Sequence, residues 1–147
     1  MTKLLLTLLI PCALALGGCS ELDNCPDAQA PVVIESGTTY AEARIYESSA
    51  WDEDLVYFPA KTLVRFKHDL GTRPEIVLSY VSFSPNGVAQ SDVTENTGNQ
   101  GRIVCVDANE IDIVNDTCEE DFYIRVSAYA SGEGSTEAVC PRPKDLD

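Results

Sequence analysis

Residues 121–130 alternate strictly between two sets of side chains, and this pattern constrains the fold more than any other in the chain. One set comprises Phe122, Ile124, Val126, Ala128 and Ala130, and the other comprises Tyr123, Arg125, Ser127 and Tyr129. Successive side chains of a β-strand point to opposite faces of its sheet. The alternation therefore predicts a strand with its apolar face on the core.

Other short segments with strand character recur along the chain and are separated by turn signals. They are Val32–Ile34, Thr39–Tyr46, Leu55–Phe58, Thr62–His68, Glu75–Phe83, Arg102–Asp107 and Glu110–Val114, with weaker candidates at Val88–Gln90 and Thr136–Cys140. Asn86-Gly87 predicts a tight hairpin turn, because both residues accept positive φ. The polar stretch Ser91–Gly101 predicts a loop, and the apolar stretch Glu75–Phe83 predicts a central strand with both faces covered. Seven to nine strands predict an all-β fold, either a small antiparallel β-sandwich or a Greek-key barrel.

The first 19 residues differ in composition from the rest. Lys3 precedes the apolar run Leu4–Leu16, which would span only about 20 Å as a helix and is too short to cross a hydrocarbon core. The run ends in Leu16-Gly17-Gly18-Cys19, which resembles the lipobox of bacterial lipoproteins. The resemblance implies cleavage before Cys19, a diacylglyceryl thioether on its sulfur, and acylation of the new amino group by a fatty acid such as palmitate.

The residue after the cysteine bears on localisation. Position 20 is Ser, whereas Asp there is the usual inner-membrane retention signal of Gram-negative lipoproteins. The resemblance thus implies lipid anchoring in the outer membrane, with either the periplasmic or the surface face open. The alternative is a secreted protein whose Cys19 pairs with another cysteine.

These observations divide the chain into a signal peptide (1–18), a lipidated tether (19–31) and a β-sandwich domain (32–147). Cleavage would leave 129 residues with 9 basic and 24 acidic side chains, a net charge of −15. This length suits one domain. The acidic balance argues against nucleic-acid binding, which relies on Lys and Arg to neutralise phosphates.

Four cysteines would remain after cleavage and lipidation: Cys25, Cys105, Cys118 and Cys140. An even number in an oxidising compartment predicts two disulfides with three possible connectivities. We favour Cys105 with Cys118, and Cys25 with Cys140. A metal site is not expected, because there is no CxxC motif and the only histidine is distant in sequence. No other cofactor is expected.

A second resemblance covers residues 63–82, LVRFKHDLGTRPEIVLSYVS. An apolar strand that ends in His-x-Leu-Gly, followed by a proline before the next strand, is similar to units of the H-type lectin domain and of phage tail-fibre receptor-binding domains. The resemblance implies a small sandwich that oligomerises and binds sugars. It carries over no sugar-binding residue.

Catalytic chemistry has few candidates in this sequence. His68 is the only histidine, and we interpret it as a residue at the rim of the core that bonds to a loop, with a base or a sugar contact as the alternative. The chain has neither a GxSxG nucleophile elbow nor a Gly-rich phosphate loop. Acidic clusters at 52–54 and 107–112 leave open a weak calcium site or a carboxylate pair for glycoside hydrolysis.

Exposed aromatic residues are the better candidates for a site. Trp51 lies in an acidic loop, and Tyr123 and Tyr129 lie on the strand face opposite the apolar set. All three could stack on a sugar ring or contact a protein. We therefore expect a non-catalytic binding module for a protein or glycan ligand, anchored to a membrane by lipid. The alternatives are an accessory or structural lipoprotein of an envelope complex and, less favoured, a hydrolase.

Overall fold

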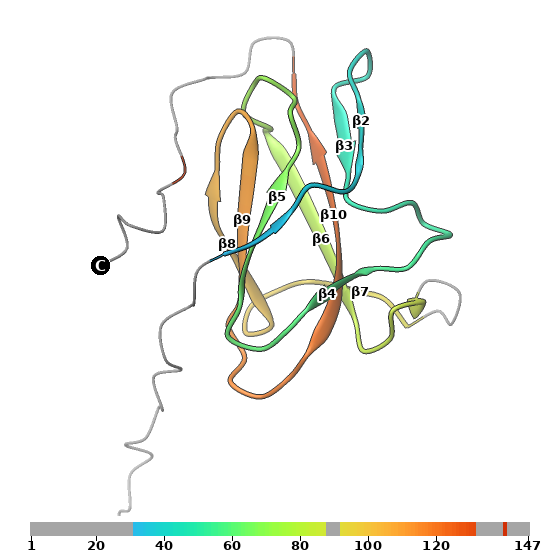
Figure 1. Ribbon diagram of the computed structural model, residues 1–147, viewed down its shortest axis with the longest axis vertical. Helices are drawn as coiled ribbons and strands as arrows, with labels where there is room; N and C mark the ends of the chain where they lie inside the picture. Colours follow the sequence, from blue (N-terminus) through green and yellow to red (C-terminus); the bar gives the residue numbers. More distant parts are fainter. Residues whose placement is uncertain (1–30, 88–91, 132–139, 141–147) are drawn as a thin grey trace, which may run out of the picture.

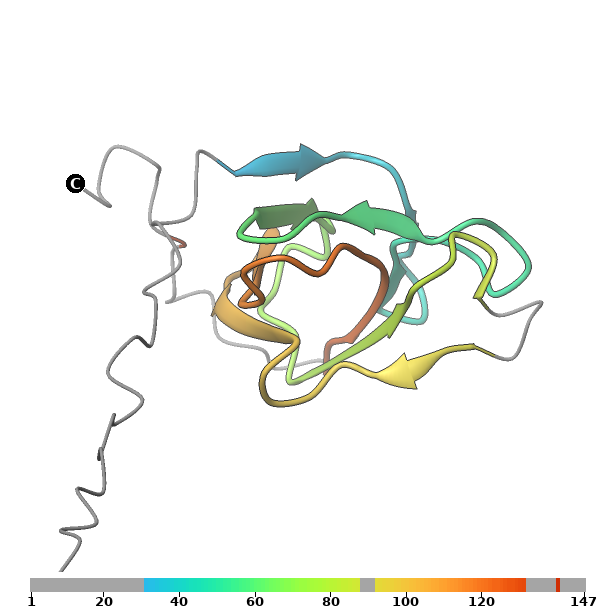
Figure 2. The same ribbon diagram turned by 90° about the horizontal axis from the view of Figure 1, so that it is seen from below.

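The computed structural model describes residues 31–87, 92–131 and 140, which form two β-sheets packed face to face (Figures 1 and 2). The four-stranded sheet has the order β1 (Val32–Ile34), β5 (Leu63–Lys67), β9 (Glu110–Asn115) and β8 (Gly101–Val106). The other sheet has the order β2 (Thr38–Tyr40), β3 (Ile45–Glu47), β10 (Phe122–Tyr129), β6 (Ile76–Ser82) and β7 (Thr94–Glu95), and β4 (Val56–Phe58) also pairs with β10. Among the described residues all pairings are antiparallel except β1 with β5. The predicted all-β sandwich is confirmed, and the barrel alternative is not adopted.

Strand β10 organises the six-stranded sheet. One of its edges pairs with β6 from Tyr123 to Tyr129. The opposite edge pairs with β4 near its start and with β3 near its end. The segment 48–55 that joins β3 to β4 therefore leaves the sheet edge beside the middle of β10. In Figure 1 this segment projects away from the four-stranded sheet.

The core lies between the two sheets, and β10 contributes its apolar set to it. Phe122, Ile124, Val126 and Ala128 are all buried, as the alternation predicts. They pack against buried residues of the facing sheet, which include Val64, Phe66, Ile111 and Ile113. Burial of each large apolar side chain contributes roughly 1.5–3 kcal/mol. The opposite set on β10 consequently faces outward.

Three local predictions differ from the structure. Thr39–Tyr46 is not one strand but the hairpin β2–β3, turned at Arg44, which has φ of 55°. The stretch predicted as a loop, 91–101, contains the short strand β7 beside β6. The outer face of β6 is not covered throughout, since Ile76 is 54% exposed. The candidate strand at 88–90 and residues 136–139 lie outside the described residues.

The favoured disulfide pairing is wrong, because Cys105 bonds to Cys140 with a Cα–Cα distance of 5.5 Å. Cys105 lies opposite Asp112 on β9, whereas Cys118 follows the far end of that strand, where Asn115 pairs with Gly101. Four residues of β8 then separate Cys105 from that end, which is about 13 Å at the rise of a strand. A disulfide tolerates a Cα–Cα distance of at most about 7 Å. Cys118 is itself disulfide-bonded, and Cys25 and Cys19 lie outside the described residues.

Candidate functional site

Arg125 lies in the middle of the outer face of the six-stranded sheet and is fully buried there. Its Nε donates to the carbonyl of Ser49 at 2.9 Å, and Nη2 donates to Glu47 Oε1 at 2.6 Å. Nη1 donates to the hydroxyl of Ser127. Burial of an arginine is costly unless its charge is paired and its donors are satisfied. These bonds meet that requirement and tie segment 48–55 to β10.

Trp51 completes the burial of Arg125. The guanidinium carbon lies 4.1 Å from the centroid of the indole ring, which is cation–π geometry. The indole also meets the ring of Tyr80 edge-on, with centroids 5.2 Å apart. Trp51 is nevertheless 45% exposed. It therefore covers Arg125 from outside while it presents a large aromatic surface to solvent.

A second aromatic pair lies at the next outward-facing position of β10, two residues before Arg125. The rings of Tyr57 and Tyr123 are 5.5 Å apart, and the two residues are register partners on β4 and β10. The Tyr57 hydroxyl donates to Asp121 Oδ2 at 2.6 Å, and this bond raises the pKa of the phenol. Asp121 also accepts from the backbone N–H of Ala60. Tyr57, 50% exposed, is thus an oriented neutral phenol on the outer face.

We define the Trp51 face as the surface formed by Trp51, Tyr57, Tyr80, Tyr123 and Arg125. Two of the three predicted ligand-binding residues, Trp51 and Tyr123, belong to it. Tyr129 lies on the same side of the sheet but at the other end of β10, opposite Ile76. The alternation of β10 already placed Arg125 beside Tyr123. Tyr57 and Tyr80 could not be found in this way, because only the register of β4 and β6 brings them to this face.

The composition of the Trp51 face is that of a protein interface. Its accessible side chains are Trp and Tyr, with Arg125 buried beneath them, and both residue types are enriched at interface positions that dominate binding energy. A contiguous apolar patch on the surface of a monomer marks an interaction site, and on this face Trp51 and Tyr57 are exposed beside the half-buried Tyr80 and Tyr123. Trp51 and Tyr57 are also held in place before binding, by Arg125 and by Asp121 respectively. They therefore lose little conformational entropy when a partner binds.

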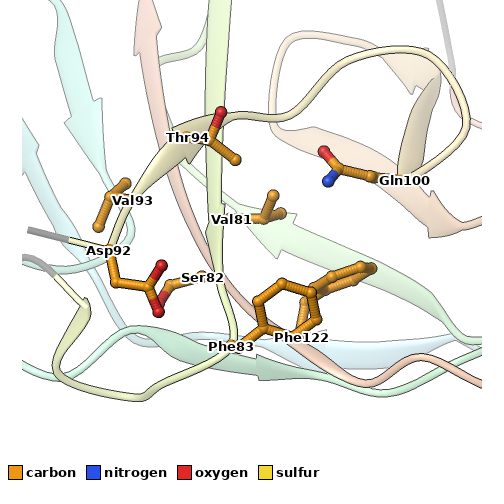
Figure 3. Close-up of a pocket in the computed structure, with 8 residues that line it drawn as sticks. All are labelled: Val81, Ser82, Phe83, Asp92, Val93, Thr94, Gln100 and Phe122. Atoms are coloured by element: carbon orange, nitrogen blue, oxygen red, sulfur yellow. The ribbon is translucent and has the colours of Figure 1, made fainter.

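A small pocket of about 130 Å³ opens near the end of β6. Figure 3 shows the rings of Phe83 and Phe122 together beside Val81, with Asp92 and Gln100 to either side. Phe83 is 64% exposed, and its ring contacts that of Phe122 in a tilted arrangement with the centroids 5.1 Å apart. The volume equals that of roughly four water molecules, well below the 300–1,000 Å³ of a typical ligand site. It suits one small ring or one side chain.

His68 is a structural residue, as interpreted from the sequence. It is fully buried, its Nδ1 accepts from the N–H of Leu70 at 3.2 Å, and its Nε2 lies 3.2 Å from the carbonyl of Asp107. Both ring nitrogens are thereby used by the backbone. Burial lowers the pKa of His68, so its imidazole stays neutral to a lower pH than that of an ordinary histidine.

This histidine predicts a dependence of stability on pH. The unfolded state binds a proton near pH 6.5 more readily than the folded state does, so the free energy of unfolding falls as the pH drops below that value. The steepest slope for one proton is about 1.4 kcal/mol per pH unit. Urea unfolding between pH 7 and 5 should show a loss of stability in the wild type, with this slope as its upper limit for His68, and a flatter profile in His68→Gln. Equal slopes would contradict the assignment.

The acidic cluster at 107–112 has a structural role, which is clearest for Asp107. The carboxylate of Asp107 accepts from the backbone N–H groups of Asn109, Glu110 and Cys140. Although burial alone would raise the pKa of Asp107, these donors lower it. No group of three potential metal ligands occurs in residues 31–87, 92–131 and 140.

Comparison with protein-family models, curated proteins and solved structures finds no match to this chain. Within the described part of the chain, no helix has the length and apolar character needed to cross a membrane.

Proposed function

We propose that this protein is a lipid-anchored, non-catalytic binding module whose Trp51 face docks a protein partner at the cell envelope. The observation that carries the proposal is the exposed aromatic surface held in place by buried Arg125. If the partner is itself an envelope protein, this docking function is an accessory role in an envelope complex. A hydrolase is less favoured, because the one histidine is buried and bonded to backbone groups.

The proposed anchor rests on Leu16-Gly17-Gly18-Cys19 and on the acidic, cysteine-containing domain that follows. Three acyl chains on one cysteine provide stable membrane attachment, since even two suffice. Mass spectrometry of the mature protein should find a chain that begins at a triacylated Cys19. A mature chain with an unacylated Cys19 would overturn the anchor.

A glycan is a second candidate ligand, favoured by the pocket beside Phe83. An exposed aromatic ring next to Asp92, Thr94 and Gln100 offers both a stacking surface and hydrogen-bond partners for a sugar hydroxyl. Binding on a glycan array that is lost in Phe83→Ala but kept in Trp51→Ala would favour this site. A blank array would leave the protein partner as the proposed ligand.

The docking proposal is tested by site-specific photo-crosslinking in intact envelopes. A photoreactive residue at Tyr57 should give one dominant adduct with a protein. The same residue at Val33, which is 44% exposed on β1 of the other sheet, serves as the matched control and should not give that adduct. Equal adducts from both positions, or none from Tyr57, would contradict the proposal.

A further inference from the structure

We propose that the Trp51 face recognises a cationic segment of its partner, rich in lysine or arginine. This inference rests on the proposed docking function and specifies the chemistry of the partner. It follows from the charges that surround the aromatic surface and from the way the protein uses its own basic residues.

Carboxylates border the Trp51 face on several sides. Asp52, Glu53 and Asp54 directly follow Trp51 and are all exposed. Glu95 on β7 is exposed and is the register partner of Tyr80. Asp121 is exposed beside Tyr57. The aromatic surface is therefore bordered by negative charge contributed by segment 48–55, by β7 and by the start of β10.

Most basic residues in the described part of the chain are already paired with carboxylates. The described residues contain seven Lys and Arg, and four of them pair with carboxylates of the same chain. Those four are Arg65, Lys67, Arg102 and Arg125. The whole chain carries a formal net charge of −14. A second copy of this chain would bring like charges together, which disfavours self-association through this face.

A basic segment fits both parts of the surface. The methylene stems of Lys and Arg cover aromatic rings, and their charged ends remain in contact with water and with carboxylates at the rim. The exposed faces of the tyrosine and tryptophan rings attract the same cations. Opposite charge also speeds the encounter of the two proteins.

The probe for this inference is an octalysine peptide, with octaglutamate as the negative control. Trp51 is the only tryptophan in the chain, so its fluorescence reports on this face alone. Octalysine should produce a saturable change in Trp51 fluorescence, and octaglutamate should not. Because exposed charges are screened by salt, raising NaCl from about 50 to 500 mM should weaken the binding.

Two matched charge variants separate local recognition from attraction to the net charge. Asp52→Asn with Asp54→Asn should weaken octalysine binding about threefold to tenfold, because two exposed charges that would pair with the peptide are removed and solvent screening keeps each such pair weak. The control variant, Glu35→Gln with Asp69→Asn, also removes two negative charges, but from positions that follow β1 and β5 in the four-stranded sheet. Asn at position 69 tolerates the positive φ that Asp69 adopts there. This second variant should change the binding less than twofold.

Equal weakening by both variants, or no saturable response of Trp51, would overturn the cationic partner. The docking function itself is tested separately by the crosslink at Tyr57. An adduct there without octalysine binding would reject only the charge of the partner. Loss of both would reject the docking function as well.

Discussion

Replacing Arg125 with methionine is expected to lower the free energy of unfolding by about 3–5 kcal/mol, the usual cost of breaking a buried ion pair from one side. The substitution leaves Glu47 without its cation, and the Ser49 carbonyl and Ser127 hydroxyl lose their donor. Trp51 also loses the group on which it stacks. Urea unfolding measures the stability, and Trp51 fluorescence in the folded state reports the freed indole.

Arg102→Met is the matched control for this prediction. Arg102 also forms a two-point pair with a carboxylate, that of Asp116, but its side chain is mostly exposed. Solvent screening limits such pairs to about 1 kcal/mol or less. If both variants lost the same small amount of stability, the central role of Arg125 in the Trp51 face would be rejected.

The double variant Cys105→Ser, Cys140→Ser is expected to lose about 4 kcal/mol of stability. The disulfide closes a loop of 35 residues, and the chain-entropy model gives this magnitude for a loop of that length. The measurement is chemical unfolding under non-reducing conditions. With a reducing agent present, the wild type and the variant should have nearly the same unfolding midpoint.

Peptide mapping of the unreduced protein provides an independent check of the same bond. Proteolysis should release a linked pair of peptides that contain Cys105 and Cys140. If Cys12 is removed with the signal peptide and Cys19 carries lipid, Cys25 is the cysteine left to partner Cys118. A linked peptide with Cys105 and Cys118 would contradict the structure.

The sequence was most informative where one pattern extends over a whole strand. The alternation of residues 122–129 correctly gave both the core face of β10 and the outward direction of Tyr123 and Arg125. The strands β8 and β9 were also predicted, as the segments Arg102–Asp107 and Glu110–Val114, because they need only local strand and turn signals. In these places local propensity and burial favour the same structure.

The remaining features depend on contacts between distant segments. The turn at Arg44 requires a non-glycine residue with positive φ, which no local signal indicates. The Trp51 face requires β3 and β4 to share one edge of β10, so that segment 48–55 can fold over Arg125. The Cys105–Cys140 bond depends on the length of β9 and on Asp107, which binds the N–H of Cys140. The spacing of the cysteines in the sequence indicates neither the length of β9 nor the contact with Asp107.

A fluorine label on Trp51 reports whether this residue lies at the centre of the docking surface. Protein labelled with 5-fluorotryptophan gives a single ¹⁹F resonance, because the chain has one tryptophan. Addition of detergent-solubilised envelope from cells that lack this protein should shift or broaden that resonance, and excess unlabelled protein should reverse the change. Unlabelled Trp51→Ala should not reverse it. A resonance unchanged in position and width at saturating envelope extract would contradict the docking of a partner on the Trp51 face.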